Sequence, residues 1–276
     1  MSQLPPSPIN PFLIFNFQTA VSKPDKLIKL HLEANYVKQN LDRHIFFFIF
    51  KSSMSGIIVI TTLFDNQVLS CELKNPRKKN ALSLNMIEEI IALLSKKKID
   101  QDYKCIVFKG FKDKTFCAGA DLNEVLSFKK NNKLNVYHSK LNKLLKILRK
   151  KNILKLSIIS EHCIGAGFIL AMSTDICIVK EGSNFSIPAS KLKIKLPKYQ
   201  INQLINKFPG NLLLKEAIIT GRSFSAKEAY NFNLINLVLK KNNFKKNYLS
   251  YLSNLIKLEK QMRDYYNKSM LVKVKN

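Results

Sequence analysis

The sequence predicts an α/β domain, in which β-strands alternate with helices along the chain. Short apolar runs rich in β-branched residues are separated by stretches with helical periodicity, which is the pattern of such domains. Glycine is scarce, with 8 in 276 residues. Six of them follow a strand, open a helix or sit in a turn, where the backbone needs positive φ or close approach: Gly110, Gly119, Gly165, Gly167, Gly210 and Gly221.

The strands are expected where β-branched and apolar residues run together. They are placed at Ile57–Leu63, Val68–Leu73, Cys105–Phe108, Leu156–Ile159 and Ile176–Val179, with a turn at Asp65 and Asn66 between the first two. The helices are expected where apolar residues recur at helical spacing. They are placed after an N-cap at Ser83, at Leu134–Leu148, from Gly165 to Met172, at Ala226–Phe232 and at Phe244–Tyr265.

Residues 1–53 differ in sequence pattern from the rest of the chain. Five prolines fall within the first 24 positions and break any early helix. The segment is poor in Arg and carries Asp25, Glu33 and Asp42, unlike a typical transit peptide. We expect an appended or wrongly assigned leader without structure of its own, and a domain that begins near Met54. The chain is then expected in the cytoplasm, or in an organellar matrix if the leader is a targeting segment.

The net charge of +27 raises the question of a polyanionic partner. Almost all of the positive residues are Lys, spread along the chain rather than clustered, so compositional drift explains the charge better than a nucleic-acid surface. No apolar run approaches the ~20 residues of a membrane span. The five cysteines have an odd count and no metal or disulfide spacing, so we expect core thiols and no metal site.

Two glycine turns carry the candidate chemistry. In the first, a strand ends at Phe108, and Gly119, Ala120 and Asp121 open a helix about ten residues later. In the second, Ile159 ends a strand and Gly165-Ala-Gly opens another helix. Each turn presents free backbone N–H groups at a helix N-terminus. Two such groups converging on one point would form an oxyanion hole for a carbonyl becoming an enolate or a tetrahedral oxyanion.

At these residues the chain resembles the crotonase superfamily, the enoyl-CoA hydratase/isomerase family, over roughly Ile57 to Leu239. The matching motifs are Asn75-Pro-Arg-Lys-Lys-Asn-Ala-Leu82, Phe116-Cys-Ala-Gly-Ala-Asp-Leu122, Gly165-Ala-Gly167 with Asp175, Phe185-Ser-Ile-Pro188, and Thr220-Gly-Arg with Ser225-Ala-Lys-Glu-Ala229 and Asn236. The resemblance implies a crotonase (ClpP-like) spiral of ββα turns with an acyl-CoA site in residues 54–239. It also implies a helical trimerisation segment at 240–276, and homotrimers or hexamers.

The resemblance also implies roles for single residues. The backbone N–H groups of Ala120 and Ala166 would form the oxyanion hole, although Ala166 stands where the family usually has Gly. Arg77, Lys78 and Lys79 would contact the adenine and phosphates of coenzyme A, and Ala118, Asp121 and Leu122 would line the site. Asp121 is interpreted first as a helix-start residue stabilised by the helix dipole. The expected partner is an acyl-CoA thioester, with no cofactor beyond the coenzyme A of the substrate.

Two departures from the family decide the expected mechanism. The positions of the two hydratase glutamates are occupied by Ile169 and Ala189, which can neither donate nor accept a proton. The usual Gly-Gly turn is replaced by Leu196-Pro-Lys-Tyr199. Four nearby side chains are candidates for another acid or base, with His162 the foremost: His162, Ser160, Lys191 and Tyr199. For each of them, a structural or surface role is the preferred interpretation.

Three functions stay open at this point. The first is an enzyme that stabilises an acyl-CoA enolate or oxyanion without paired glutamates, by decarboxylation or thioester hydrolysis, for example. The second is a non-catalytic acyl-CoA-binding homologue or partner subunit. The third is RNA binding through Lys140, Lys143, Lys146 and Arg149, which recur at every third residue. On a helix that row winds around about half the circumference, so a solvated helix face is the better interpretation.

Overall fold

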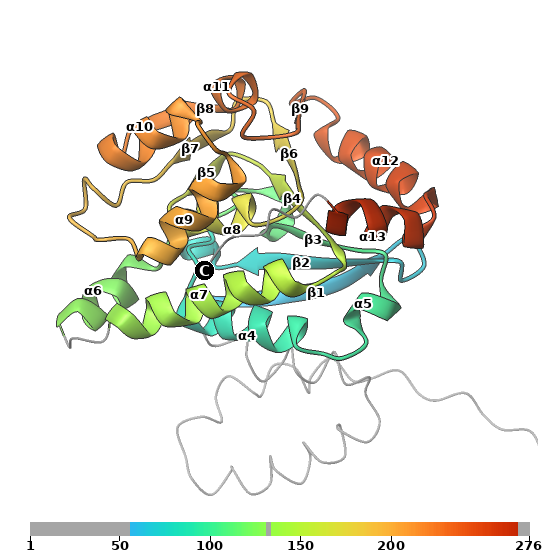
Figure 1. Cartoon of the computed structure of the whole chain (residues 1–276), viewed down its shortest axis with the longest axis horizontal. Coiled ribbons are helices and arrows are strands. Elements are labelled where there is room, and N and C mark those ends of the chain that lie inside the picture. Colours follow the sequence, from blue (N-terminus) through green and yellow to red (C-terminus); the bar gives the residue numbers. More distant parts are fainter. Residues whose placement is uncertain (1–55, 131–133, 270–276) are drawn as a thin grey trace, which may run out of the picture. The chain divides into compact units, whose positions relative to one another are not determined.

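The computed structural model describes residues 56–130 and 134–269, so the predicted leader at 1–53 lies outside the described residues. A six-stranded sheet has the order β1-β2-β3-β4-β6-β9 (Figure 1). Its first pair is antiparallel and every later pair is parallel. The strands are β1 (Ile57–Leu63), β2 (Val68–Lys74), β3 (Cys105–Gly110), β4 (Leu154–Ile159), β6 (Ile176–Lys180) and β9 (Leu237–Leu239). The strands predicted from the sequence are therefore confirmed to within two residues at either end.

A second, three-stranded sheet consists of β5 (His162–Ile164), β7 (Asn184–Ser186) and β8 (Ser223–Ser225). β5 pairs parallel with β7, and β7 pairs antiparallel with β8. These strands have three residues each, too short to show an alternating pattern in the sequence. The small sheet matters because β5 leads directly into the second glycine turn.

Some of the helices, α4 (Leu84–Leu94) among them, begin at a residue whose side chain caps the first turn. The hydroxyl of Ser83, the predicted N-cap of α4, accepts a hydrogen bond from the Met86 N–H at 3.2 Å. In α7 (Leu134–Lys150) the predicted stripe of leucines is buried. Every residue of α8 (Ala166–Met172) is buried. The other helices of this part are α5 (Ile99–Asp102), α6 (Leu122–Lys130), α9 (Lys198–Lys207), α10 (Leu212–Thr220) and α11 (Ala226–Asn231), with 3-10 turns at Pro76–Lys78 and Phe111–Asp113.

The larger sheet separates two hydrophobic clusters, one on each face. Side chains of β3 alternate between them, as a pleated strand requires. Ile106 and Phe108 pack with α4, α7 and α8. Cys105 and Val107 pack with α12 (Phe244–Lys257), which buries Phe244, Tyr248, Leu252 and Ile256. Because both faces are covered, the strands are buried and the βα turns at their ends keep fixed positions.

The expectation of one helix over Phe244–Tyr265 is wrong, because the helix is interrupted. Leu258 has extended backbone (φ −65°, ψ 143°), and α13 (Lys260–Ser269) follows. The apolar stripe that holds α12 on the sheet ends at Ile256. Beyond it the Lys260 ammonium donates to the backbone carbonyls of Asp100 and Gln101, which draws the chain toward α5. Helical spacing on both sides of the break hid it in the sequence.

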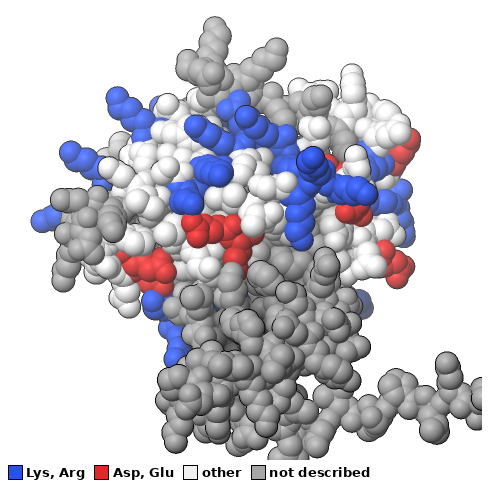
Figure 2. Space-filling view, turned by 90° about the horizontal axis from the view of Figure 1, so that it is seen from below, with Lys and Arg blue, Asp and Glu red and all other residues white. Residues whose placement is uncertain are grey.

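All five thiols are free and buried, as expected of core cysteines. Burial raises the pKa of Cys117 to about 12. Within residues 56–130 and 134–269, no group of three or more His, Cys, Asp or Glu side chains could hold a metal ion. No helix in these ranges is both long and apolar enough to cross a membrane. Figure 2 shows Lys and Arg side chains spread across the viewed face, with acidic side chains among them.

Candidate functional site

The two glycine turns lie against each other. Gly119 has φ +104° and Gly165 has φ +50°, values that L side chains rarely adopt. A Cβ on Gly165 would lie 3.8 Å from the Cα of Gly119. The segments leading into the turns are joined through Cys117, whose N–H donates to the His162 carbonyl at 3.0 Å and whose carbonyl accepts from the Ile164 N–H at 2.9 Å. The fold therefore brings the two predicted turns together.

The backbone at Ala120 has a defined direction. Leu82 and Ala120 form an isolated parallel bridge, in which the Leu82 N–H donates to the Gly119 carbonyl at 2.7 Å and the Leu82 carbonyl accepts from the Asp121 N–H at 3.1 Å. Successive backbone groups of an extended chain point to opposite sides. The N–H of Ala120 itself therefore points away from Leu82.

The second N–H group stands at a helix start. Ala166 is the first residue of α8, so its N–H has no acceptor within that helix. The helix dipole adds partial positive charge at the same end. Since a Cβ on Gly165 would already reach the Cα of Gly119, the two glycines lie close together, and the residues that follow them, Ala120 and Ala166, each carry an N–H group near this junction. Two such donors could bind one carbonyl oxygen.

Close packing fixes where α8 begins. A Cβ on Gly167 would lie 2.5 Å from the Cβ and 2.7 Å from the Sγ of Cys117, so only glycine fits there. Alanine is tolerated at the preceding position, where Ala166 is 8% exposed. The start of α8 is thus held against the loop that carries Ala120.

The loop predicted to contact coenzyme A is hydrogen-bonded to the segment that carries Ala120. Asn80 donates its side-chain amide to the Thr115 carbonyl at 2.7 Å, and the Ala118 N–H donates to the Lys79 carbonyl at 3.1 Å. The side chains of Arg77 and Lys79 are exposed at this loop. The chain thus presents two exposed cationic side chains beside the segment that holds Ala120.

Lys78 and Asp121 form an ion pair across the two loops. The Lys78 Nζ lies 2.9 Å and 2.6 Å from the two carboxylate oxygens of Asp121. The same carboxylate accepts from the Asn123 N–H at 3.1 Å, which supports the interpretation of Asp121 as a helix-start residue. Ala118 is half-buried and Leu122 is exposed at the start of α6.

The two positions expected to lack glutamates differ in their surroundings. Ile169 is 1% exposed within α8 and packs in the core, while Ala189 is half-buried and its carbonyl accepts from the Ile194 N–H at 2.9 Å. Neither side chain can transfer a proton. The predicted alternative His162 is half-buried on β5.

The other acid or base candidates take separate positions. Ser160 is buried between β4 and β5, with its carbonyl accepting from the Phe116 N–H at 3.0 Å. Lys191 is exposed beside Gly221. The ring of Tyr199 lies under the Lys146 ammonium, 5.2 Å from it. Tyr199 therefore contacts α7.

Two site residues were missed by sequence reasoning. Tyr137 is 1% exposed, and its hydroxyl donates to the Leu82 carbonyl at 3.0 Å. Burial raises the pKa of Tyr137 well above its usual value, so it stays a donor. It lies one turn before Leu141 on the apolar stripe, and a buried tyrosine needs a partner. Glu124 accepts from the Leu84 N–H at 2.8 Å across 40 residues, and no local signal announces that contact.

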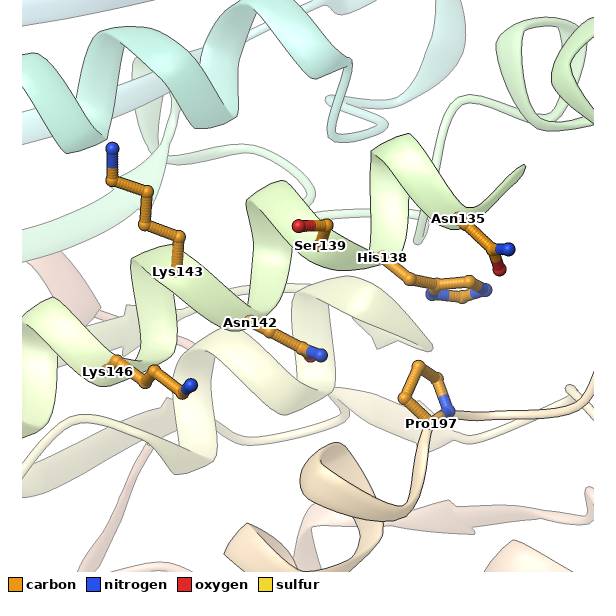
Figure 3. Close-up of a pocket in the computed structure, with 7 residues that line it drawn as sticks. All are labelled: Asn135, His138, Ser139, Asn142, Lys143, Lys146 and Pro197. Atoms are coloured by element: carbon orange, nitrogen blue, oxygen red, sulfur yellow. The ribbon is translucent and has the colours of Figure 1, made fainter. Parts of the chain in front are cut away.

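A pocket of about 470 Å³ lies between α7 and Pro197 (Figure 3). Asn135, His138, Asn142 and Lys146 line the side of α7 that faces Pro197. Both ring nitrogens of His138 are buried without a hydrogen-bond partner among the described residues. Burial lowers the pKa of His138, which keeps the ring neutral at physiological pH.

The sequence profile of the Enoyl-CoA hydratase/isomerase family matches residues 64–276. The chain belongs to this family. It is 26% identical over 177 residues to the short-chain-enoyl-CoA hydratase of Clostridium acetobutylicum, covering 63% of this chain and 66% of that protein. It is 26% identical over 173 residues to the "Probable enoyl-CoA hydratase 2, mitochondrial" of Arabidopsis thaliana, covering 63% and 57%. The chain thus spans about two thirds or less of these two relatives.

Solved structures confirm the crotonase fold of this family member. An enoyl-CoA hydratase/carnithine racemase from Magnetospirillum magneticum has a TM-score of 0.72 at 21% identity, covering 79% of this chain and 80% of that one. A Thermobifida fusca protein crystallised in complex with acetoacetyl-CoA has a TM-score of 0.67 at 21% identity, covering 76% and 84%. At these identities the likeness establishes the fold alone.

Proposed function

We propose that this protein binds an acyl-CoA thioester and polarises its carbonyl with the backbone N–H groups of Ala120 and Ala166. One observation carries the proposal: the two glycine turns touch, with 3.8 Å between the Cα of Gly119 and a Cβ placed on Gly165. The N–H of Ala120 points away from its bridge partner, and that of Ala166 opens a helix. Preorganised donors of this kind stabilise negative charge that develops on oxygen.

The charged side chains near the site support a phosphorylated ligand. Arg77 and Lys79 are exposed on the loop that is bonded to the Ala120 segment. Cationic side chains at this place suit the pyrophosphate and 3′-phosphate of coenzyme A. A complex with acetoacetyl-CoA in one structural neighbour supports the same ligand class. The site requires no cofactor beyond the coenzyme A that the substrate carries.

The reaction we propose is not hydration. Adding water across a conjugated double bond needs a positioned acid and base, each typically worth 10²- to 10⁴-fold in rate. Ile169 and Ala189 supply neither, and Ile169 is 1% exposed and packs in the apolar core. Decarboxylation or thioester hydrolysis needs oxyanion stabilisation without this pair. Non-catalytic binding of acyl-CoA is the second candidate, favoured by the same buried Ile169.

RNA binding is less well supported by the described residues. The Lys140 ammonium lies 2.7 Å from a Glu88 carboxylate oxygen. Lys146 lies over the ring of Tyr199. Lys140 and Lys146, two members of the four-residue basic row on α7, are thus engaged within the molecule, and the row does not form one continuous cationic face.

The experiment compares binding of butyryl-CoA and free CoA to the purified full chain by calorimetry, and follows crotonyl-CoA by loss of its conjugated absorbance. We expect tighter binding of the thioester, and no turnover in the 1–10³ s⁻¹ range typical of enzymes. Equal affinity for the two ligands would overturn the oxyanion-hole proposal. Turnover in that range would overturn the argument from the missing glutamates and direct attention to His162.

A matched pair of proline variants tests the N–H of Ala166. Proline is tolerated at the first position of a helix but has no N–H to donate. Ala166→Pro should abolish the preference for the thioester. Leu212→Pro makes the same change at the first position of α10, where the side chain is 69% exposed, and should leave the preference intact.

A further inference from the structure

Lys78 takes a different position from its two basic neighbours. Arg77 and Lys79 are exposed, whereas the Lys78 ammonium binds both oxygens of Asp121 at 2.9 Å and 2.6 Å. The Asp121 side chain is 1% exposed and that of Lys78 is 33% exposed. Two hydrogen bonds to one carboxylate leave the ammonium a single free donor.

Asp121 is bonded directly to the residue whose N–H is proposed to bind the thioester. Asp121 is held in place by two hydrogen bonds. The Asp121 N–H donates to the Leu82 carbonyl at 3.1 Å, and the Asp121 carboxylate accepts from the Asn123 N–H at 3.1 Å. Lys78 completes this arrangement by neutralising the buried carboxylate. Without it the buried charge would have no cation partner, which favours movement of Asp121 toward water.

The ion pair therefore joins two functions within one short stretch of structure. The Pro76–Lys78 turn and its C-cap residue Lys79 present the side chains proposed to contact coenzyme A. The Ala118–Asp121 loop presents the N–H proposed to contact the acyl carbonyl. The main-chain bond from Ala118 to Lys79, at 3.1 Å, runs beside the ion pair. A displacement of one loop is thus transmitted to the other.

We propose that Lys78 is a positioning residue, which holds the Ala120 N–H in place through Asp121, while Arg77 and Lys79 bind the phosphates. The inference rests on the proposed function. It separates the roles of three adjacent basic residues. Loss of Lys78 weakens recognition of the thioester group selectively, and loss of Arg77 weakens recognition of the nucleotide that CoA and acyl-CoA share.

The test measures dissociation constants of the full-length chain for free CoA and for butyryl-CoA, and takes their ratio as the thioester preference. Lys78→Met should lower the preference about tenfold, as loss of a charge-assisted contact predicts, with the affinity for free CoA little changed. Lys78→Arg keeps a cation at this position and should therefore keep the thioester preference of the wild type. Arg77→Ala should weaken the binding of both ligands by the same factor, so the thioester preference stays unchanged. The loss of affinity should be larger at low salt than at high salt.

Asp121→Asn keeps the size of the side chain and its acceptor for Asn123, but it removes the charge and leaves the Lys78 ammonium one acceptor oxygen in place of two. It should lower the preference by less than Lys78→Met does, because it leaves no buried charge unpaired. It also decides the matter if Lys78→Met does not fold. Combining Lys78→Met with Asp121→Asn should lower the preference less than Lys78→Met alone, because the double variant has no unpaired buried carboxylate. An unchanged preference in Asp121→Asn would overturn the inference.

Failure of the inference differs from failure of the proposed function. A wild-type preference of one overturns the proposed function itself. A clear wild-type preference, together with equal weakening of both ligands in Lys78→Met, overturns only the positioning role and makes Lys78 a phosphate ligand like Arg77.

Discussion

Replacing Gly167 by alanine should destabilise the fold through a single added methyl group. That group would lie 2.5 Å from the Cβ, 2.7 Å from the Sγ and 3.1 Å from the carbonyl oxygen of Cys117. All three are parts of a buried residue whose backbone is bonded to β5, so none can give way cheaply. Overpacking of this kind costs about 1–3 kcal/mol. The better helix propensity of alanine returns up to about 1 kcal/mol. Because a 2.5 Å contact places this site toward the upper end of the overpacking range, we expect a net loss of about 1–2 kcal/mol.

Urea unfolding followed by circular dichroism measures this loss as a lower midpoint with an unchanged slope. The double variant Gly167→Ala with Cys117→Gly supplies the control, because it removes both side-chain atoms that the new methyl group meets. Its destabilisation should be smaller than the sum of the two single effects. A wild-type midpoint in Gly167→Ala, or strict additivity in the double variant, would refute the reasoning. Gly167→Ala should also lower the thioester preference, because α8 has to move away from the Ala120 loop.

Two further predictions concern Tyr137 and His138. Tyr137→Phe removes the hydrogen bond to Leu82, so it should lose about 1 kcal/mol of stability together with part of the thioester preference. Tyr248→Phe is the control. It removes a 2.9 Å hydrogen bond to Asp113 on the other face of the sheet, so it should lose stability and keep the preference. If both variants keep the preference, Tyr137 has no role in positioning the loop. Burial lowers the pKa of His138 from 6.5, so the unfolded chain binds the proton first. The stability contributed by the neutral ring is therefore present above about pH 6.5 and lost as pH falls through the lowered pKa. Melting temperatures of wild type and His138→Asn should show the wild type losing more stability between pH 7.5 and pH 5, and parallel curves would contradict the assignment.

The sequence predicted those parts of the fold whose signals are local. β1 and the Ser83 cap follow from periodicity and from the chemistry of single side chains. The three-residue strands of the small sheet lack any such signal, since their partners lie elsewhere in the chain. The break at Leu258 was missed because it depends on where α12 loses contact with the sheet.

The same distinction between local signals and long-range contacts applies to the candidate site. Gly119 and Gly165 were predicted from backbone requirements, and the structure brings them close together. The pairing of Lys78 with Asp121 spans 43 residues, and both residues had satisfactory local roles, as a phosphate contact and a helix start. The hydroxyl of Tyr137 reaches across 55 residues to Leu82. Contacts of this range depend on the assembled fold, so periodicity could not supply them.

The five buried thiols have a consequence for how motions of this protein could be observed. A thiol reagent attacks the thiolate, and burial raises the pKa of Cys71, Cys117 and Cys163, so the closed molecule should react very slowly. Labelling then reports transient openings. Cys105 lies in the cluster beneath α12, and the other four lie on the opposite face of the sheet. Mass spectrometry of labelled peptides over time would thus time the opening of each face separately. Cys117, at the junction of the two glycine turns, would report how often the proposed oxyanion loop comes apart and whether an acyl-CoA ligand slows that event.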